Sequence, residues 1–179
     1  MPERLDPKRA ALVVIDVQEG FRPAVDEFDR VARATGTLIQ GAEAVGIPVL
    51  ITEQYPKGLG ETVPEVAEHL PDGVDPIEKV CFSVAEAEGF DLAGRDQVIL
   101  AGVETHVCVN QTVLDLLERG VGTQVVADAV ASRTGANREL GLHKMERAGA
   151  TVTSVETALF ELLRGSDAPA FKEVQALIL

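Results

Sequence analysis

Three residues in this chain of 179 have the side chains that covalent catalysis requires: Asp16, Lys79 and Cys108. A thiolate is the nucleophile of cysteine enzymes, and a nearby carboxylate can take the thiol proton as a general base. An ammonium group beside them stabilises both anions. The thiolate of such a set would attack an electrophilic carbon, commonly a carbonyl. The carboxylic acid would return its proton to the leaving group, and water would complete the cycle. The three residues therefore predict a nucleophilic site, provided that the fold brings them together.

The position of Cys108 predicts a thiol with a lowered pKa. It follows an apolar run that ends at Gly102 and Val103, where a helix is expected to begin. A thiol near a helix N-terminus lies at the positive end of the helix dipole, which favours the thiolate. Alternatives stay open for each member of the set. Cys108 could be a small buried hydrophobe, Asp16 a capping or turn residue, and Lys79 a surface residue on an edge strand.

Short apolar runs that alternate with helical segments must position these three residues. The pattern predicts strands at 11–17, 46–52 (after an opening turn), 74–81, 97–101, 122–127 and 151–154. It predicts helices at 25–45, 64–69, 105–119, 136–148, 155–163 and 170–179. This alternation indicates one α/β domain over 1–179, a three-layer α/β/α sandwich with a six-stranded, mainly parallel sheet. Since such sheets place their sites beyond the carboxyl ends of the strands, one crevice could hold all three residues.

Composition argues against several classes of partner. With 16 basic and 29 acidic residues the net charge is -13, whereas nucleic acids and anionic membranes require a basic face. No apolar run reaches the roughly 18 residues of a membrane span, and no signal peptide is visible. Two cysteines without a secretion signal predict reduced thiols and a cytoplasmic location. The three histidines have no zinc-binding spacing. We therefore expect a small-molecule substrate, with no nucleic acid and no membrane as partner.

Three motifs resemble those of the isochorismatase-like cysteine hydrolases. The segment 11–21, Ala-Leu-Val-Val-Ile-Asp-Val-Gln-Glu-Gly-Phe, resembles the opening motif of that superfamily. Lys79 and the segment 102–109, Gly-Val-Glu-Thr-His-Val-Cys-Val, match its second and third motifs in order and spacing. The resemblance runs from about residue 8 to residue 165. The segments 52–60 and 79–83 further resemble the isochorismatase domain-containing proteins, a subgroup whose physiological substrates are generally unsettled.

The resemblance implies a role for each motif residue. Asp16 would be the base, Lys79 its electrostatic partner and Cys108 the nucleophile. The family also carries a non-proline cis peptide bond, which here would be Val103–Glu104. Its implied role is to aim backbone N–H groups, at Glu104 and at Cys108, towards the oxyanion that develops during the reaction.

Four residues are candidates for lining the substrate pocket: Gln18, Phe21, Tyr55 and Val103. Gln18 could equally make a structural hydrogen bond, and Tyr55 could simply pack within its loop. The nicotinamidase branch of the superfamily binds a metal through an Asp-x-His pair, where this chain has Glu53 and Tyr55. Because neutral tyrosine is a poor zinc ligand, we expect no catalytic metal and no cofactor, and nicotinamide is a doubtful substrate.

Neighbours of the catalytic candidates have open roles. Cys81 is two residues from Lys79, so on a strand it would share its face; it could be a second thiol near the site or a packed core residue. His106 is two residues before Cys108, a helical spacing at which side chains do not face one another, so we expect it to pack at the rim or against a neighbouring subunit. Three residues after the fifth strand could reach the crevice: Arg133, Thr134 and Asn137.

These observations predict a metal-independent cysteine hydrolase that cleaves a C–N bond of a small amide-like molecule through a covalent Cys108 intermediate. Hydrolysis of a vinyl ether, as in the isochorismatase branch, is an alternative that needs no thiolate. A non-catalytic interaction protein on the same fold is another. A nucleotide-binding protein is disfavoured because the chain lacks a Gly-x-Gly-x-x-Gly turn and a Walker loop. By resemblance we also expect a homo-oligomer, in which the apolar C-terminus, 176–179, could pack on a partner subunit.

Overall fold

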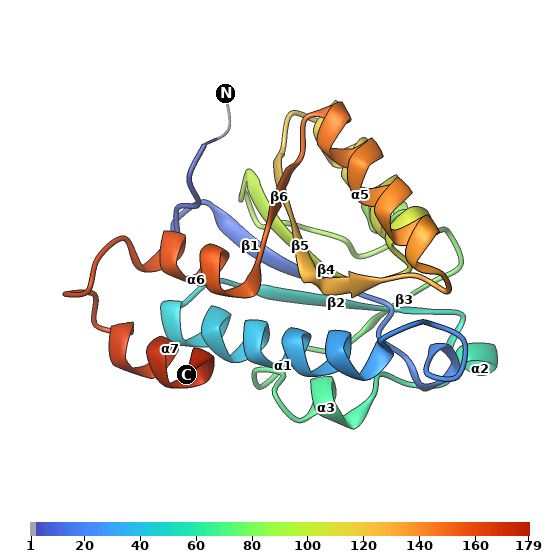
Figure 1. The fold of residues 1–179 in the computed structure, drawn as a ribbon, viewed down its shortest axis with the longest axis horizontal. Helices are drawn as coiled ribbons and strands as arrows, with labels where there is room; N and C mark the ends of the chain where they lie inside the picture. The colour runs from blue at the N-terminus through green and yellow to red at the C-terminus, as the bar shows by residue number, and fades with distance from the viewer. Residues whose placement is uncertain (1–2) are drawn as a thin grey trace.

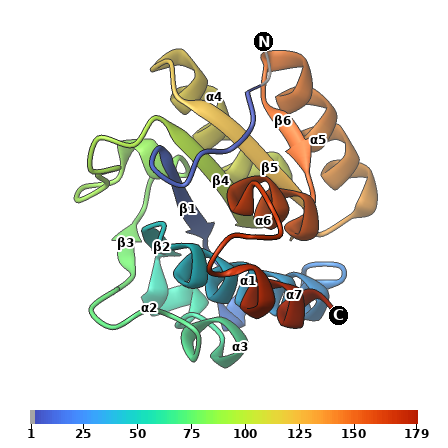
Figure 2. The same cartoon turned by 90° about the vertical axis from the view of Figure 1, so that its left-hand side faces the viewer.

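A six-stranded parallel sheet forms the centre of the protein (Figures 1 and 2), whose residues 3–179 are described by a computed structural model. The strands are β1 (Ala10–Ile15), β2 (Val49–Gln54), β3 (Ile77–Lys79), β4 (Gln97–Val103), β5 (Gly122–Ala131) and β6 (Thr151–Thr153). They pair in the order β3-β2-β1-β4-β5-β6, and every pair is parallel. The predicted fold class is confirmed, with a sheet that is wholly rather than mainly parallel.

Helices cover both faces of this sheet and complete the three layers (Figure 1). The longer ones are α1 (Phe28–Val45), α4 (Asn110–Glu118), α5 (Gly135–Ala148), α6 (Val155–Leu163) and α7 (Phe171–Ile178). The short ones are η1 (Glu19–Phe21), α2 (Pro56–Leu59), α3 (Pro64–Ala67), η2 (Val84–Glu86) and η3 (Thr105–Val109), of which η3 is a π-helical turn. One layer holds α1, α3, α6 and α7, and the other holds α4 and α5.

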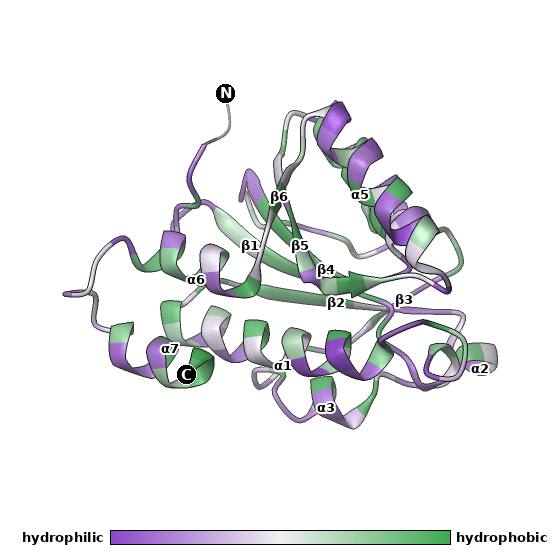
Figure 3. Ribbon diagram, in the orientation of Figure 1, coloured by the Kyte–Doolittle hydropathy of each residue, from purple (hydrophilic) through white to green (hydrophobic). Residues whose placement is uncertain are grey.

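The sequence of β1 shows why the sheet must be covered on both sides. All six residues of Ala10–Ile15 are buried, although their side chains alternate between the two faces. Leu12 and Val14 pack with the α1 layer, whereas Val13 and Ile15 pack with the α4 layer. Figure 3 shows that the central strands are hydrophobic, whereas α5 carries many hydrophilic residues. Among residues 3–179, no helix has both the length and the apolar character that crossing a bilayer requires.

Helix ends follow local signals in the sequence. The helix α1 ends at Gly46, which adopts a left-handed conformation (φ 77°) and donates its N–H to carbonyls of the last turn. Ser154 and Thr134 begin α6 and α5, since each side chain accepts a backbone N–H three residues further on. The predicted helix at 25–45 starts later, at Phe28, because the residues before it form turns after η1.

The third strand is much shorter than predicted. We expected a strand over 74–81, but only Ile77–Lys79 pairs with the sheet, through the last three residues of β2. The chain bends directly after Lys79, whose ammonium group hydrogen-bonds the carbonyls of Cys81 and Phe82. Cys81 therefore lies outside the sheet and is half-buried, so the expectation that it is a strand residue packed in the core is wrong.

The close approach of β4 to β1 depends on a glycine, and this generates a prediction. Gly102 has φ 123°, and a Cβ there would clash with the carbonyl oxygen of Ile15 on β1. We expect Gly102→Ala to destabilise the fold by more than about 4 kcal/mol, since both backbone strain and a backbone clash must be accommodated. Urea unfolding followed by circular dichroism measures this loss.

Gly46→Ala is the matched control, because Gly46 also has a positive φ but open space around its Cα. Its cost should be only about 1–2 kcal/mol, the cost of the left-handed conformation alone. Equal losses in the two variants would show that the approach of β4 to β1 tolerates a side chain.

Candidate active site

The three catalytic candidates lie at the carboxyl edge of the sheet, around the point where the strand order reverses. Asp16 follows β1, and Cys108 lies in η3 after β4, so they flank the boundary between these neighbouring strands. Ligands of open parallel sheets bind in the crevice that forms at such a point. Lys79 ends β3, two strands or about 10 Å away from β1, and only a long side chain can span that gap. The structure thus brings together residues that are far apart in the sequence.

Asp16 is held in one orientation by two hydrogen bonds. Its Oδ2 lies 2.8 Å from Lys79 Nζ, and its Oδ1 accepts the hydroxyl of Thr52 at 2.7 Å. The side chains of both Asp16 and Lys79 are fully buried, so the pair has no contact with solvent. Asp16 also adopts a left-handed backbone conformation (φ 54°), which costs an aspartate about 1–3 kcal/mol and is typical of functional sites.

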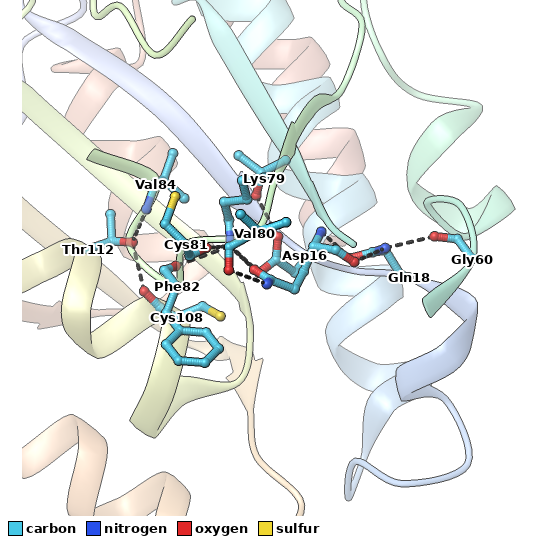
Figure 4. Close-up of polar contacts among 12 residues, drawn as sticks. Asp16, Gln18, Gly60, Lys79, Val80, Cys81, Phe82, Val84, Cys108 and Thr112 are labelled. Atoms are coloured by element: carbon cyan, nitrogen blue, oxygen red, sulfur yellow. Dashed lines mark hydrogen bonds and ion pairs between the residues drawn. The ribbon is translucent and has the colours of Figure 1, made fainter. Parts of the chain in front are cut away.

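The Lys79 ammonium group is surrounded by acceptors (Figure 4). Besides Asp16, it lies 2.7 Å from Gln54 Oε1, 3.2 Å from the carbonyl oxygen of Cys81 and 3.1 Å from that of Phe82. An ammonium group has three protons, and four oxygens compete for them here. The charge of Lys79 therefore acts on the site through space, while its donors are used within the protein.

The thiol of Cys108 is buried and stays protonated at neutral pH. Its residue is only 4% exposed. Its pKa is raised to about 12: burial is the largest cause, the negative charge of Asp16 acts in the same direction, and the positive charge of Lys79 opposes them. The expected lowering of the pKa by the helix dipole is wrong for the resting protein, because loss of solvation outweighs it. A reaction at this thiol would require proton transfer to a base, and Asp16 is the adjacent candidate.

A threonine that the sequence analysis did not single out joins two catalytic segments. Thr112 Oγ1 accepts the backbone N–H of Val84 at 2.9 Å and donates to the carbonyl oxygen of Cys108 at 2.7 Å (Figure 4). The segment after Lys79 is thereby fixed to the helix that carries the thiol. The only sequence signal was the spacing, because a threonine hydroxyl can bond the carbonyl four residues earlier in a helix.

The start of η3 is tied to the end of β5. The Val103–Glu104 peptide bond is cis. The buried Glu104 carboxylate accepts both the backbone N–H and the side-chain Nε of Arg133, at 2.9 and 3.1 Å. His106 Nδ1 lies 3.0 Å from Ser132 Oγ, so this histidine packs against the same strand end. Arg133 thus lies at this edge of the sheet, with its side chain largely exposed.

Two of the four pocket candidates do not line a pocket. Gln18 is fully buried, and its amide bonds the backbone of Gln54 and Gly60, so the structural alternative applies. Val103 is also fully buried and belongs to the core beneath the site. Phe21 is partly buried against the same core. Tyr55 is 54% exposed, which leaves it available to a ligand.

The position that binds metal in the nicotinamidase branch has a structural role here. Glu53 Oε1 accepts both the backbone N–H and the hydroxyl of Thr62, each at 2.7 Å, and so closes the loop after β2. Within residues 3–179, no three His, Cys, Asp or Glu side chains are grouped in a way that could hold a metal ion. The donor set at this edge of the sheet consists instead of one carboxylate, one ammonium and one thiol.

Exposed apolar side chains surround this edge of the sheet. Phe82 is 51% exposed and Val80 is 80% exposed, and both lie in the bend that follows Lys79. Gln54 Nε2 donates to the carbonyl oxygen of Val80, and Tyr55 N donates to that of Lys79, which places Tyr55 beside the same bend. We call these three residues, Tyr55, Val80 and Phe82, the apolar rim.

Comparison with solved structures gives close matches over nearly the whole chain. A structure of MAR1 ribonuclease from Caenorhabditis elegans is 42% identical, with a TM-score of 0.93 that covers 98% of this chain and 92% of that one. YcaC from Pseudomonas aeruginosa, described with hexane-2,5-diol and covalent acrylamide, is 28% identical with a TM-score of 0.89, covering 100% and 93%. The Escherichia coli YcaC gene product, described as an octameric hydrolase of unknown specificity, is 27% identical with a TM-score of 0.87, covering 97% and 90%.

Sequence comparison agrees with these structural matches. Isochorismatase domain-containing protein 2A of Mus musculus is 39% identical over 178 residues, which cover 98% of this chain and 85% of the mouse protein. The family model of the isochorismatase domain matches residues 10–157, from β1 into α6. This protein therefore belongs to the isochorismatase domain family, as its motifs predicted.

Proposed function

We propose that this protein is a metal-independent cysteine hydrolase that cleaves a C–N bond in a small amide-like molecule. The observation that carries the proposal is the buried Lys79–Asp16 ion pair beside the buried, protonated thiol of Cys108. Burying a charge pair costs free energy that ordinary packing would avoid, so its presence at the switch point of the sheet favours a chemical role. Covalent acrylamide on the Pseudomonas relative is consistent with a reactive nucleophile in this family.

The reaction proceeds in two steps. Cys108 Sγ attacks the carbonyl carbon while its proton passes to Asp16. The C–N bond then breaks, the nitrogen takes the proton from Asp16, and an acyl group stays on Cys108 as a thioester. Water attacks the thioester carbon in the second step, with Asp16 again taking a proton and returning it to the departing sulfur.

Stabilisation of the oxyanion falls to the backbone N–H groups of Glu104 and Cys108, which lie at the start and within η3. Lys79 has its donors engaged by protein oxygens, so it stabilises the developing charges through space rather than by contact with substrate. Preorganised donors of this kind contribute most when the site excludes water, as the burial of Cys108 implies.

The substrate we propose is small and not a nucleic acid. The ribonuclease name of the Caenorhabditis structure belongs to that protein. This chain has a net charge of -13, and its one cation at the nucleophile, Lys79, is buried and paired. A polyanionic substrate would be repelled over long range by this net charge, and the exposed Arg133 at this edge of the sheet is itself paired with Glu104. The apolar rim instead suits a molecule with an apolar part next to its amide.

We further propose that the protein is a cytoplasmic homo-oligomer. The octameric Escherichia coli relative supports assembly, and the apolar rim and the C-terminal Leu179 leave large hydrophobic side chains exposed in the single chain. Large exposed apolar side chains that gather on one face, as in the apolar rim, favour an interaction site. The cytoplasmic location remains a prediction from the cysteine content.

The acyl intermediate can be tested directly. With p-nitrophenyl acetate we expect a burst of p-nitrophenolate and a protein that gains the mass of one acetyl group at Cys108, because the activated ester bypasses the need for a matched leaving group. Cys108→Ser should lower the rate by roughly 10³-fold or more, whereas Cys81→Ala should retain it. Screens of small amides and of vinyl ethers then identify which kind of bond the protein cleaves. Turnover that survives Cys108→Ser would contradict the covalent mechanism.

The raised pKa of Cys108 predicts the pH dependence of its alkylation. Below a pKa of about 12 the thiolate fraction rises tenfold per pH unit. The rate constant for iodoacetamide at Cys108 should therefore increase steadily from pH 7 to pH 10 without a plateau. Intact-mass spectrometry in a Cys81→Ala background measures it. A plateau below pH 9 would show a preformed thiolate and would reverse the role given to Asp16.

Asp16→Asn should separate thiol reactivity from hydrolysis. Removing the negative charge next to Cys108, while Lys79 stays, lowers the pKa of the thiol, so alkylation at pH 8 becomes faster. Hydrolysis should fall by about 10²–10⁴-fold because the general base is gone. Asp26→Asn, on the surface loop before α1, is the control and should change neither rate. If both rates fall together in Asp16→Asn, Asp16 is needed to make the thiol accessible rather than to move its proton.

A further inference from the structure

We propose that Gln54 is a positioning residue of this site, whose side-chain amide holds the Lys79 ammonium group against Asp16. The inference rests on the proposed function, since the positioning concerns the proposed general base and nucleophile. It adds a residue that the expected catalytic set does not contain. Gln54 is the last residue of β2, the strand that lies between β3 and β1.

The amide of Gln54 bridges the side chain of Lys79 and the backbone that follows it. Gln54 Oε1 lies 2.7 Å from Lys79 Nζ, and Gln54 Nε2 donates to the carbonyl oxygen of Val80 at 2.9 Å. One partner is a donor only and the other an acceptor only, so the amide can satisfy both in just one orientation. The bridge therefore fixes the ammonium group relative to the start of the bend after β3.

Gln54 is itself fixed by Gln18, which is fully buried (Figure 4). Gln18 Oε1 accepts the backbone N–H of Gln54 at 2.7 Å, and Gln18 Nε2 donates to the carbonyl oxygen of Gln54 at 3.0 Å. A second bond from Gln18 Nε2, 2.7 Å long, reaches the carbonyl oxygen of Gly60. The last residue of β2 is thus anchored through both of its peptide groups, and its side chain projects from a rigid support.

Lys79 needs a residue that positions its side chain because it lies on the edge strand, away from Asp16. It ends an edge strand of three residues and must extend a flexible four-carbon side chain past β2 to reach Asp16. The two carbonyl oxygens of Cys81 and Phe82 that also contact it belong to the bend after its own strand. Gln54 is the acceptor that comes from the intervening strand β2. It therefore fixes the position of the ammonium group between the backbone of Lys79 and Asp16.

A neutral acceptor also suits the charge balance of the site. Asp16 and Lys79 offer one negative and one positive charge to Cys108, and only the positive one favours the thiolate. A carboxylate in place of the Gln54 amide would accept from Lys79 equally well but would add a second negative charge. Glutamine thus provides the hydrogen bond without opposing ionisation of the thiol.

The test compares Gln54→Glu and Gln54→Met with a matched control, Gln40→Glu. Gln40 lies on α1, and its side-chain Nε2 donates to the carbonyl oxygen of Gly36 in the same helix. In a Cys81→Ala background, we expect iodoacetamide to alkylate Cys108 about tenfold more slowly at pH 9 in Gln54→Glu, which is one pKa unit, and severalfold more slowly in Gln54→Met. Gln40→Glu should stay within about twofold of the parent, because only net charge changes.

A charge-relocation variant tests the contact between position 54 and Lys79 even if the single variants fold poorly. Asp16→Asn leaves the buried Lys79 charge without a carboxylate and should lower the unfolding temperature. Adding Gln54→Glu to Asp16→Asn should recover most of that loss, since a carboxylate then lies within reach of Nζ. Adding Gln40→Glu to Asp16→Asn should recover none. Hydrolysis should not return in either double variant, because position 54 cannot replace the base at position 16.

The alkylation and unfolding measurements test the role of Gln54 separately from the proposed hydrolytic function. Alkylation and unfolding need no turnover, so they report on Gln54 even if no amide is hydrolysed. If Gln54→Glu alkylates at the parental rate, or if its addition to Asp16→Asn restores no stability, Gln54 does not position Lys79 and the inference is overturned. If instead both effects appear and every amide and vinyl ether is inert, the positioning stands and the hydrolytic function fails.

Discussion

The buried ion pair between Lys79 and Asp16 is the interaction on which the rest of the site depends. Removing two charges from water costs several kcal/mol per ion, and Coulomb attraction offsets this only with good geometry and further hydrogen bonds. The protein supplies these from Thr52, Gln54 and two backbone carbonyl groups. Each of these partners lies on β2 or in the bend after β3. The ion pair therefore requires this strand order, as does the hydrophobic core.

The state of the thiol follows from the same arrangement. Cys108 is protonated at rest because burial and the neighbouring carboxylate both disfavour its anion. A site of this kind moves the proton when the substrate arrives, instead of storing a thiolate. In the proposed mechanism, activation of Cys108 depends on the distance and orientation of Asp16, which Thr52 and Lys79 hold in place and which Gln54 influences through Lys79.

Backbone geometry brings the nucleophile to this charge pair. Gly102 allows β4 to lie against the end of β1, so the turn that follows begins next to Asp16. Thr112 then joins the Cys108 carbonyl to the segment after Lys79, and Glu104 joins the start of η3 to Arg133. Gly141 on α5 lies directly against the backbone of His106, which fixes the turn from its outer side. The turn that carries the thiol is thus held by all the elements around it.

The amino-acid sequence by itself determined the fold class, the family and the three chemical groups. Apolar runs such as 11–15 and 98–101 are buried on both faces, so hydrophobicity alone identifies them as central parallel strands. The sequence predicted the length of the third strand less well, because strand pairing decides it. β3 is three residues long, since it pairs with only the last three residues of β2. Local pattern could not show this, since an edge strand is defined by its neighbour.

Only the tertiary structure decided how the groups act. The dipole rule predicted a lowered thiol pKa from sequence, but desolvation, which depends on every element around Cys108, has the opposite sign and is larger. Gln18 was a pocket candidate by its nearness to Asp16 along the chain, yet its amide lies against the backbone of β2. Gln54 lies in a segment that resembles the subgroup, but its role could not be predicted, because its partner Lys79 is 25 residues away and meets it across paired strands. Hydrogen bonds and solvation are properties of positions in space, which the sequence specifies only through the completed fold.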